Sequence, residues 1–228
     1  MLGATAFLDW WLATPSARDE DYTLYRQQLE LLQHLERAGA GGAGAGGAGA
    51  GGAGAPPRAW LLKDPLHCFS FDALFGALPD AKVVWLHRAP EVSTASMCSL
   101  LAAVWSRMSR ADPGPGGAAP GAWRALAVEP LARMVDAALA YRARAPRAAV
   151  LDVTMAALVA EPLATVERVY AFAGRELTPA ARAAMEAYLA RNKREKRSGA
   201  HKYALADFGC TDAEVAERFA VYKKRFGV

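Results

Sequence analysis

The sequence predicts an α/β fold in which a parallel sheet is flanked by helices. The first observation is that three short runs are almost continuously apolar, as is typical of strands buried on both faces. The second is that segments with apolar residues at helical spacing separate these runs. Strands joined by helices pair in parallel and carry helical layers on both faces of the sheet. The predicted strands are Ala59–Lys63, Lys82–His87 and Ala149–Val153.

The helical segments carry recognisable start and stop signals. Pro90 stands in the first turn of one helix, and Gly174 follows the end of another. Thr211 and Glu214 form a capping box at the start of the last helix. The predicted helices are Tyr22–Arg37, Ser70–Leu78, Glu91–Arg110, Trp123–Arg144, Pro162–Ala173, a helix opened by Thr178-Pro179, and a last helix that ends near Phe226.

Two low-complexity segments interrupt this pattern. Residues 38–55 consist of ten Gly and eight Ala, and Asp112–Gly121 holds three Pro and four Gly. Neither segment offers side chains for a core, so we interpret the first as an inserted loop and residues 112–121 as a flexible loop. The remaining residues are enough for one core, and residues 1–228 are therefore predicted to form a single domain.

Composition excludes several classes of protein. No apolar run approaches the roughly 18 residues of a membrane span, and the apolar start of the chain lacks the basic region of a secretory signal. The three cysteines, Cys68, Cys98 and Cys210, lie far apart and form no Cys-x-x-Cys motif. They are predicted to be small buried apolar residues rather than metal ligands or disulfides. We therefore expect a soluble protein of a reducing compartment, without a metal.

The net charge of +4 is concentrated in one segment. Arg191–Lys202 holds six cations and one acid, which gives this segment +5 and leaves −1 for the other 216 residues. A nearly neutral body with one basic segment favours an anionic ligand of limited size over a nucleic acid. A solvated helix face is the alternative interpretation.

Cationic residues and imidazoles follow two of the predicted strands. Ligands of parallel sheets gather at the carboxyl ends of strands, where Lys63-Asp64-Pro65-Leu66-His67 and His87-Arg88-Ala89-Pro90 stand. Ser96 lies eight residues after Arg88, near the second turn of the next helix. The guanidinium fork of Arg88 and the hydroxyl of Ser96 suit a phosphate held from two sides.

These motifs resemble those of sulfotransferases that use 3′-phosphoadenylyl sulfate, especially the branch found in bacteria and algae. The central block of that family is similar to Trp60–Leu100, with the sequence WLLKDPLHCFSFDALFGALPDAKVVWLHRAPEVSTASMCSL. The ending of the family is similar to Arg197–Val228. The similarity extends to Asp9–Trp11, Tyr25–Leu35 and Leu151–Gly174.

The resemblance implies a P-loop-NTPase-like three-layer sandwich and the transfer of a sulfuryl group from 3′-phosphoadenylyl sulfate to a hydroxyl or amine of a small molecule or glycan. It implies that His67 is the general base and that Lys63 neutralises charge on the transferred group and the leaving phosphate. Arg88 and Ser96 would hold the 3′-phosphate of the nucleotide. The tail segment Arg197, Ser198 and Gly199 would contact the same phosphate, with Ser198 where relatives often carry Lys.

One feature of the family is not found in Met1–Arg58: the first strand and the Gly/Ser/Thr-rich loop that binds the 5′-phosphosulfate. Ala13–Arg18 has neither a preceding strand nor a glycine. We therefore expect a fragment or a degenerate member that lacks the first strand and transfers sulfate weakly or not at all. Two alternatives remain: a domain that binds adenosine 3′,5′-bisphosphate without catalysis, and a helical interaction module with a basic tail.

Deletion of residues 41–55 is predicted to leave the fold intact. These residues are three copies of Gly-Gly-Ala-Gly-Ala, and loop closure changes by only about 0.6 kcal/mol per doubling of loop length. Thermal unfolding of the deletion variant should therefore give a melting temperature within a few degrees of that of the wild-type chain. Loss of cooperative unfolding would contradict this interpretation.

Overall fold

The computed structural model describes residues 6, 9–10, 13–39, 59–108, 122–146, 149–194 and 204–228. Residues 40–55 of the Gly/Ala tract and the predicted loop at 112–121 lie outside these ranges. The chain divides into two compact units, Met1–Ala81 and Lys82–Val228. The single sulfotransferase-like domain that the sequence predicts over 1–228 stays a prediction.

The first unit is helical in its described part. Its elements are α2 (Pro15–Gly39), the 3₁₀ turn η1 (Pro65–Phe69) and α3 (Phe71–Ala77), and α2 packs against α3. Asp64 caps η1, because its carboxylate accepts a hydrogen bond of 2.8 Å from the backbone N–H of Leu66. The buried side chains of this unit are Tyr22, Leu29, Cys68, Phe69, Ser70, Phe71, Ala73 and Leu74.

The predicted strand Ala59–Lys63 is wrong. Residues 59–64 form no strand, and Leu61 is 98% exposed. A strand requires a hydrogen-bonded neighbour, and the described part of the first unit contains no strand to pair with. An apolar run alone therefore does not specify a strand here.

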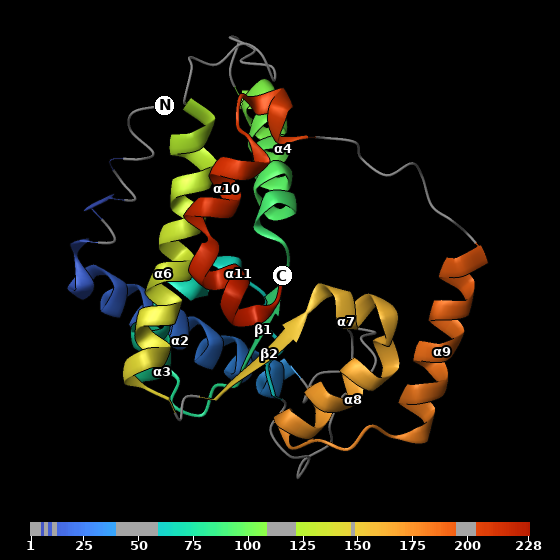
Figure 1. The fold of residues 1–228 in the computed structure, drawn as a ribbon. Helices are drawn as coiled ribbons and strands as arrows, with labels where there is room; N and C mark the ends of the chain where they lie inside the picture. The colour runs from blue at the N-terminus through green and yellow to red at the C-terminus, as the bar shows by residue number, and fades with distance from the viewer. Residues whose placement is uncertain are drawn as a thin grey trace. The chain divides into compact units, whose positions relative to one another are not determined.

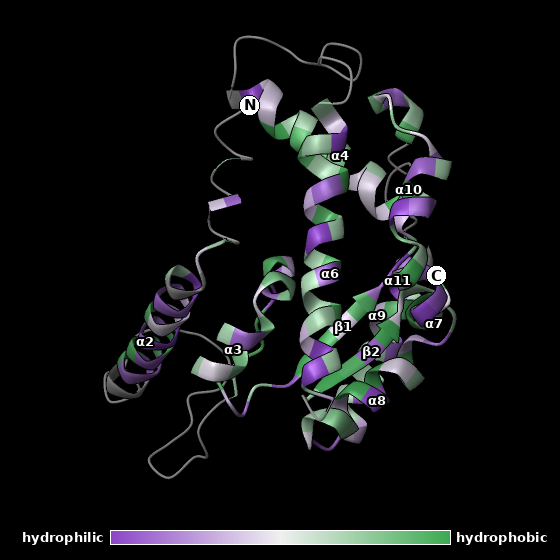
Figure 2. Cartoon of the chain, turned by 60° about the vertical axis from the view of Figure 1, so that its left-hand side comes forward, coloured by the Kyte–Doolittle hydropathy of each residue, from purple (hydrophilic) through white to green (hydrophobic). Residues whose placement is uncertain are grey.

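The second unit contains a parallel pair of strands, β1 (Val83–His87) and β2 (Val150–Thr154). Val83 pairs with Val150 at one end and His87 with Thr154 at the other. Both strands are hydrophobic over most of their length, whereas α2 is largely hydrophilic (Figure 2). The strands pair in parallel, as predicted. The prediction that both faces of the strands are buried is wrong for β1, since Val84 and Leu86 are 42% and 40% exposed.

Helices connect and follow the two strands (Figure 1). The crossover from β1 to β2 includes two long helices, which is the connection that parallel strands require. Gly174 ends α8 (Pro162–Ala173) in the left-handed region with φ of 71°, and Thr211 with Glu214 forms the predicted capping box. The predicted last helix is divided in two at Phe219. The elements of this unit are α4 (Pro90–Met108), the π-helical turn η2 (Arg124–Val128), α6 (Glu129–Arg144), α7 (Met155–Ala160), α8 (Pro162–Ala173), α9 (Pro179–Arg194), the 3₁₀ turn η3 (Leu205–Phe208), α10 (Asp212–Arg218) and α11 (Ala220–Phe226).

The three cysteines are free and buried, as the sequence predicts. Burial raises the pKa of Cys68 and that of Cys98 to about 12, so these two thiols remain protonated and unreactive at neutral pH. Among the described residues, no group of three or more His, Cys, Asp or Glu side chains could hold a metal ion. No described helix combines the length and the apolar character that a membrane crossing needs.

Candidate active site

The carboxyl end of β1 presents a cation beside a helix N-terminus. Arg88 follows β1 directly and is exposed, and α4 begins two residues later at Pro90. Ser96 lies on the second turn of α4 and is partly buried. The partial positive charge of a helix N-terminus favours an anion at this position. A guanidinium, a hydroxyl and a helix N-terminus, the kinds of group that bind phosphate, thus lie within nine residues of one another along this strand–helix junction.

An acidic residue at this end of α4 is neutralised by the C-terminal helix. Glu91, in the first turn of α4, forms an ion pair with Lys223 of α11. An unpaired carboxylate between Arg88 and Ser96 would repel an anion. The ion pair removes much of that repulsion.

His87 is the residue that immediately precedes Arg88, and its imidazole is fully buried. Its Nε2 lies 2.9 Å from Oδ1 of Asp152 on β2, and its Nδ1 lies 3.1 Å from Oη of Tyr222 on α11. A carboxylate only accepts hydrogen bonds, so Nε2–H donates to Asp152. Nδ1 of the neutral ring then accepts the hydroxyl proton of Tyr222. Both ring nitrogens are thus occupied inside the second unit.

Arg142 of α6 completes this hydrogen-bonded series. Its guanidinium donates to both oxygens of Asp152, at 2.6 and 2.9 Å. Burial by itself raises the pKa of Asp152, but the hydrogen bonds from Arg142 and His87 outweigh it and lower that pKa below its usual value. Burial lowers the pKa of His87, and Asp152 only partly offsets this. His87 is therefore neutral at pH 7.

Aromatic rings enclose the imidazole of His87. The ring of Phe226 on α11 stacks on it at 3.7 Å between centroids, and Trp85 of β1 lies 4.7 Å away. Figure 1 shows α11 close to β1, and the rings of Trp85 and Phe226 lie 5.4 Å apart between centroids. The sequence placed the imidazole of His87 with Arg88 at a ligand-facing edge, but the structure places it in the core. His87 therefore anchors the end of β1, and Arg88 is the exposed residue.

The catalytic pair that the resemblance implies lies in the first unit. Lys63 is exposed in the irregular segment before η1, and His67 is half-buried within η1. Nδ1 of His67 lies 2.7 Å from Oη of Tyr22 on α2. The rings of Tyr22 and Tyr25 each lie 5.7 Å from the imidazole. Burial lowers the pKa of His67, although the nearby Asp64 opposes this effect, so the ring is neutral at pH 7 as a general base requires.

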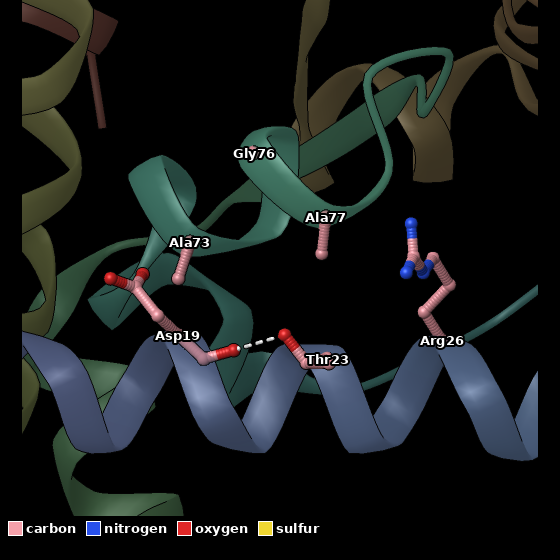
Figure 3. Close-up of a pocket in the computed structure, with 6 residues that line it drawn as sticks. All are labelled: Asp19, Thr23, Arg26, Ala73, Gly76 and Ala77. Atoms are coloured by element: carbon pink, nitrogen blue, oxygen red, sulfur yellow. Dashed lines mark hydrogen bonds between the residues drawn. The ribbon is translucent and has the colours of Figure 1, made fainter.

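A hollow of about 260 Å³ lies between α2 and α3. Figure 3 shows three polar residues of α2 facing small residues of α3 across it, and Thr23 donates a hydrogen bond of 2.8 Å to the backbone oxygen of Asp19. None of the predicted site residues lines it. The lining residues are Asp19, Thr23, Arg26, Ala73, Gly76 and Ala77.

Comparison with known proteins identifies the family of this chain. The model of the sulfotransferase family matches residues 7–179. The chain belongs to the sulfotransferase family. The crystal structure of sulfotransferase STF1 from Mycobacterium tuberculosis H37Rv matches with 34% identity and a TM-score of 0.56, over 72% of this chain and 40% of that one. Sulfotransferase STF9 from Mycobacterium avium matches with 27% identity and a TM-score of 0.65, over 75% of this chain and 43% of that one. No curated protein sequence matches this chain.

The fold is accordingly the P-loop-NTPase-like α/β fold of sulfotransferases, as the sequence predicts. The chain spans about two fifths of the length of each matched sulfotransferase structure. The tail residues Arg197, Ser198 and Gly199 lie outside the described residues. Their role in this sulfotransferase-family chain stays a prediction.

The sequence analysis did not predict the residues whose hydrogen bonds fix the imidazoles of His67 and His87, either directly or through Asp152. One signal was available for Asp152, because a carboxylate inside the apolar run AVLDV needs a buried partner. Nothing in the sequence distinguished its partners or Tyr22, since these contacts join residues from 10 to 135 positions apart. The missed residues are Tyr22, Arg142, Asp152 and Tyr222.

Replacement of Asp152 by alanine is predicted to lower the free energy of unfolding by about 2 kcal/mol, because it removes hydrogen bonds from a guanidinium and from a buried imidazole. Urea unfolding at pH 7 measures this change. Asp80→Ala, at an exposed turn position, should change it by less than about 0.5 kcal/mol.

The destabilisation caused by Asp152→Ala is predicted to depend on pH. The pKa of Asp152 is lowered in the folded state, so its stabilising effect is present above its usual pKa of 3.8 and is lost as the pH falls through the folded value. The difference between wild type and Asp152→Ala should therefore shrink at acidic pH. A difference that is constant from pH 7 to the acid transition would contradict the role of the carboxylate.

Proposed function

We propose that this chain takes part in the transfer of a sulfuryl group from 3′-phosphoadenylyl sulfate to a hydroxyl or amine of a small molecule or glycan. Membership of the sulfotransferase family supports the reaction class. The observation that carries the proposal is the donor set at the end of β1, where exposed Arg88 precedes the N-terminus of α4. Such a set recognises a phosphate, and the donor nucleotide carries one at its 3′ position.

In this proposal Arg88 and Ser96 bind the 3′-phosphate. The guanidinium provides two hydrogen bonds in a fixed fork, and the hydroxyl of Ser96 provides another. The tail residues Arg197, Ser198 and Gly199 are proposed to contact the same phosphate. The contribution of His87 is indirect, since its buried contacts fix the strand end from which Arg88 projects.

Lys63 and His67 are proposed to serve the chemical step. The bound nucleotide supplies the activated sulfuryl group. Nε2 of His67 takes the proton of the acceptor hydroxyl as its oxygen attacks the sulfur atom, and the ammonium of Lys63 neutralises charge that develops on the leaving phosphate. Positioning and charge stabilisation provide most of the rate enhancement in such in-line transfers.

Two measurements separate this proposal from the alternatives. Calorimetric titration with adenosine 3′,5′-bisphosphate tests nucleotide binding, and transfer of radioactive sulfate to a panel of hydroxylated acceptors tests catalysis. A binding domain without activity would bind the nucleotide and transfer nothing. A helical interaction module with a basic tail would do neither.

Replacement of Arg88 by alanine is predicted to weaken binding of adenosine 3′,5′-bisphosphate by about 1.5–3 kcal/mol, because a charge-assisted hydrogen-bonded pair is lost. Calorimetry on the purified variant measures the change. Arg107→Ala removes an exposed arginine from the last turn of the same helix, α4, and should leave the affinity unchanged. Equal affinities in wild type and Arg88→Ala would show that the phosphate does not bind here.

Replacement of His67 by alanine is predicted to reduce turnover by about 10²–10⁴-fold while nucleotide affinity stays nearly constant, as expected for loss of a general base. Turnover is compared in this chain and in a longer form that carries a Gly/Ser/Thr-rich phosphate-binding loop. His34→Ala, at an exposed position of α2, is the matched control. Full turnover in His67→Ala would exclude His67 as the base.

A further inference from the structure

The contact between Tyr22 and His67 joins two segments of the first unit that lie far apart in the sequence. Tyr22 projects from α2 and is 7% exposed, and its hydroxyl oxygen lies 2.7 Å from Nδ1 of His67 in η1. Tyr25, one turn further along α2, contacts the same imidazole through its ring at 5.7 Å between centroids. Two tyrosines of α2 thus contact the imidazole, and the hydroxyl of Tyr22 is hydrogen-bonded to one of its nitrogens.

The occupied nitrogen determines what the imidazole can do. A neutral imidazole has one N–H and one nitrogen lone pair. If the hydroxyl of Tyr22 donates to Nδ1, the proton of the ring is on Nε2, and Nε2 cannot accept another. If Nδ1–H donates to the hydroxyl oxygen, Nε2 keeps its lone pair. After Nε2 receives a proton both nitrogens carry N–H, and only a partner that accepts a hydrogen bond is compatible with Nδ1.

We infer that Tyr22 is a positioning residue for His67. Its hydroxyl oxygen accepts Nδ1–H and directs the lone pair of Nε2 to the acceptor of the sulfuryl group. It also stabilises the imidazolium that forms when Nε2 receives the acceptor proton. This inference rests on the proposed role of His67 as general base.

A tyrosine at this position suits the task because its hydroxyl remains neutral and can accept a hydrogen bond. Burial is the main reason that the pKa of Tyr22 is raised, and Asp64 and Asp72 add to the effect, so the hydroxyl keeps its proton at neutral pH. The ionisable groups around His67 are Tyr22 and Tyr25 of α2, Asp64 before η1, and Cys68 next in the chain. Cys68 is buried with a pKa raised to about 12. Among the described residues, Asp64 is the carboxylate whose charge acts on the pKa of His67.

Nuclear magnetic resonance of the imidazole in the Tyr22→Phe variant tests the hydrogen bond without an activity assay. The phenylalanine keeps the ring and removes the hydroxyl. If the hydroxyl accepts Nδ1–H and stabilises the imidazolium, the pKa of His67 falls in this variant. If the hydroxyl instead donates to the neutral ring, that pKa rises. Tyr25→Phe keeps the ring contact on the same helix and should leave the pKa of His67 unchanged.

Kinetics of the same variants test the catalytic consequence. In a form that carries a Gly/Ser/Thr-rich phosphate-binding loop, Tyr22→Phe should lower kcat by about three- to tenfold with KM for the donor unchanged, since a less basic imidazole removes the acceptor proton more slowly. The acid limb of the pH profile of kcat/KM should move in the direction of the pKa measured by resonance. The kcat of Tyr25→Phe should stay within about twofold of the wild-type value. A loss of activity that comes only from disturbed packing would leave the pKa of His67 unchanged.

The outcomes separate this inference from the proposed function. A lowered pKa of His67 in Tyr22→Phe, together with lowered kcat, supports the inference. An unchanged or raised pKa in Tyr22→Phe, with His67→Ala inactive, overturns the role of Tyr22 and leaves His67 as the base. Full turnover in His67→Ala overturns the proposed base, and with it the role inferred for Tyr22.

Discussion

The second unit depends on a series of hydrogen bonds that runs from Arg142 through Asp152 and His87 to Tyr222. These four residues come from α6, β2, β1 and α11, so one series joins both strands to a helix of the crossover and to the C-terminal helix. An unpaired polar group in such a place costs more free energy than a typical hydrogen bond contributes. Loss of any one of the four side chains would therefore leave at least one other member of the series without its partner. Because side chains alternate along a strand, fixing His87 inward also directs Arg88 outward.

Two imidazoles, His67 of the first unit and His87 of the second, illustrate how hydrogen-bond partners determine the role of a side chain. His87 is fully buried, and a carboxylate and a hydroxyl occupy its two nitrogens. His67 is half-buried, and within the described residues its side-chain hydrogen bond is to Tyr22 alone, through Nδ1. Burial lowers the pKa of both rings, so the pKa does not distinguish them. The two rings differ instead in their hydrogen bonds. Within the described residues, Nε2 of His67 has no side-chain hydrogen bond, and this makes His67 the candidate base.

Local signals predicted several helix ends because capping interactions are local, although α7 was not predicted and α2 begins at Pro15 rather than at Tyr22. The glycine that ends α8, the capping box of Thr211 and the proline that opens α4 all act within a few residues. Strands depend on distant partners, which is why β1 and β2 were predicted correctly while the equally apolar Ala59–Lys63 forms no strand. The exposure of Arg88 follows from its place after a strand. The contacts of Tyr22 and Arg142 depend on tertiary packing and have no local signature.

The C-terminal helix connects the core to the proposed anion site by two different interactions. Tyr222 and Phe226 bind and stack on the imidazole of His87, whereas Lys223 pairs with Glu91 in the first turn of α4. The first interaction fixes the strand end from which Arg88 projects, and the second lowers the negative potential beside Arg88 and Ser96. A carboxylate near a phosphate site weakens binding unless a cation compensates for its charge. The helix α11 therefore contributes to both the geometry and the electrostatics of this strand end.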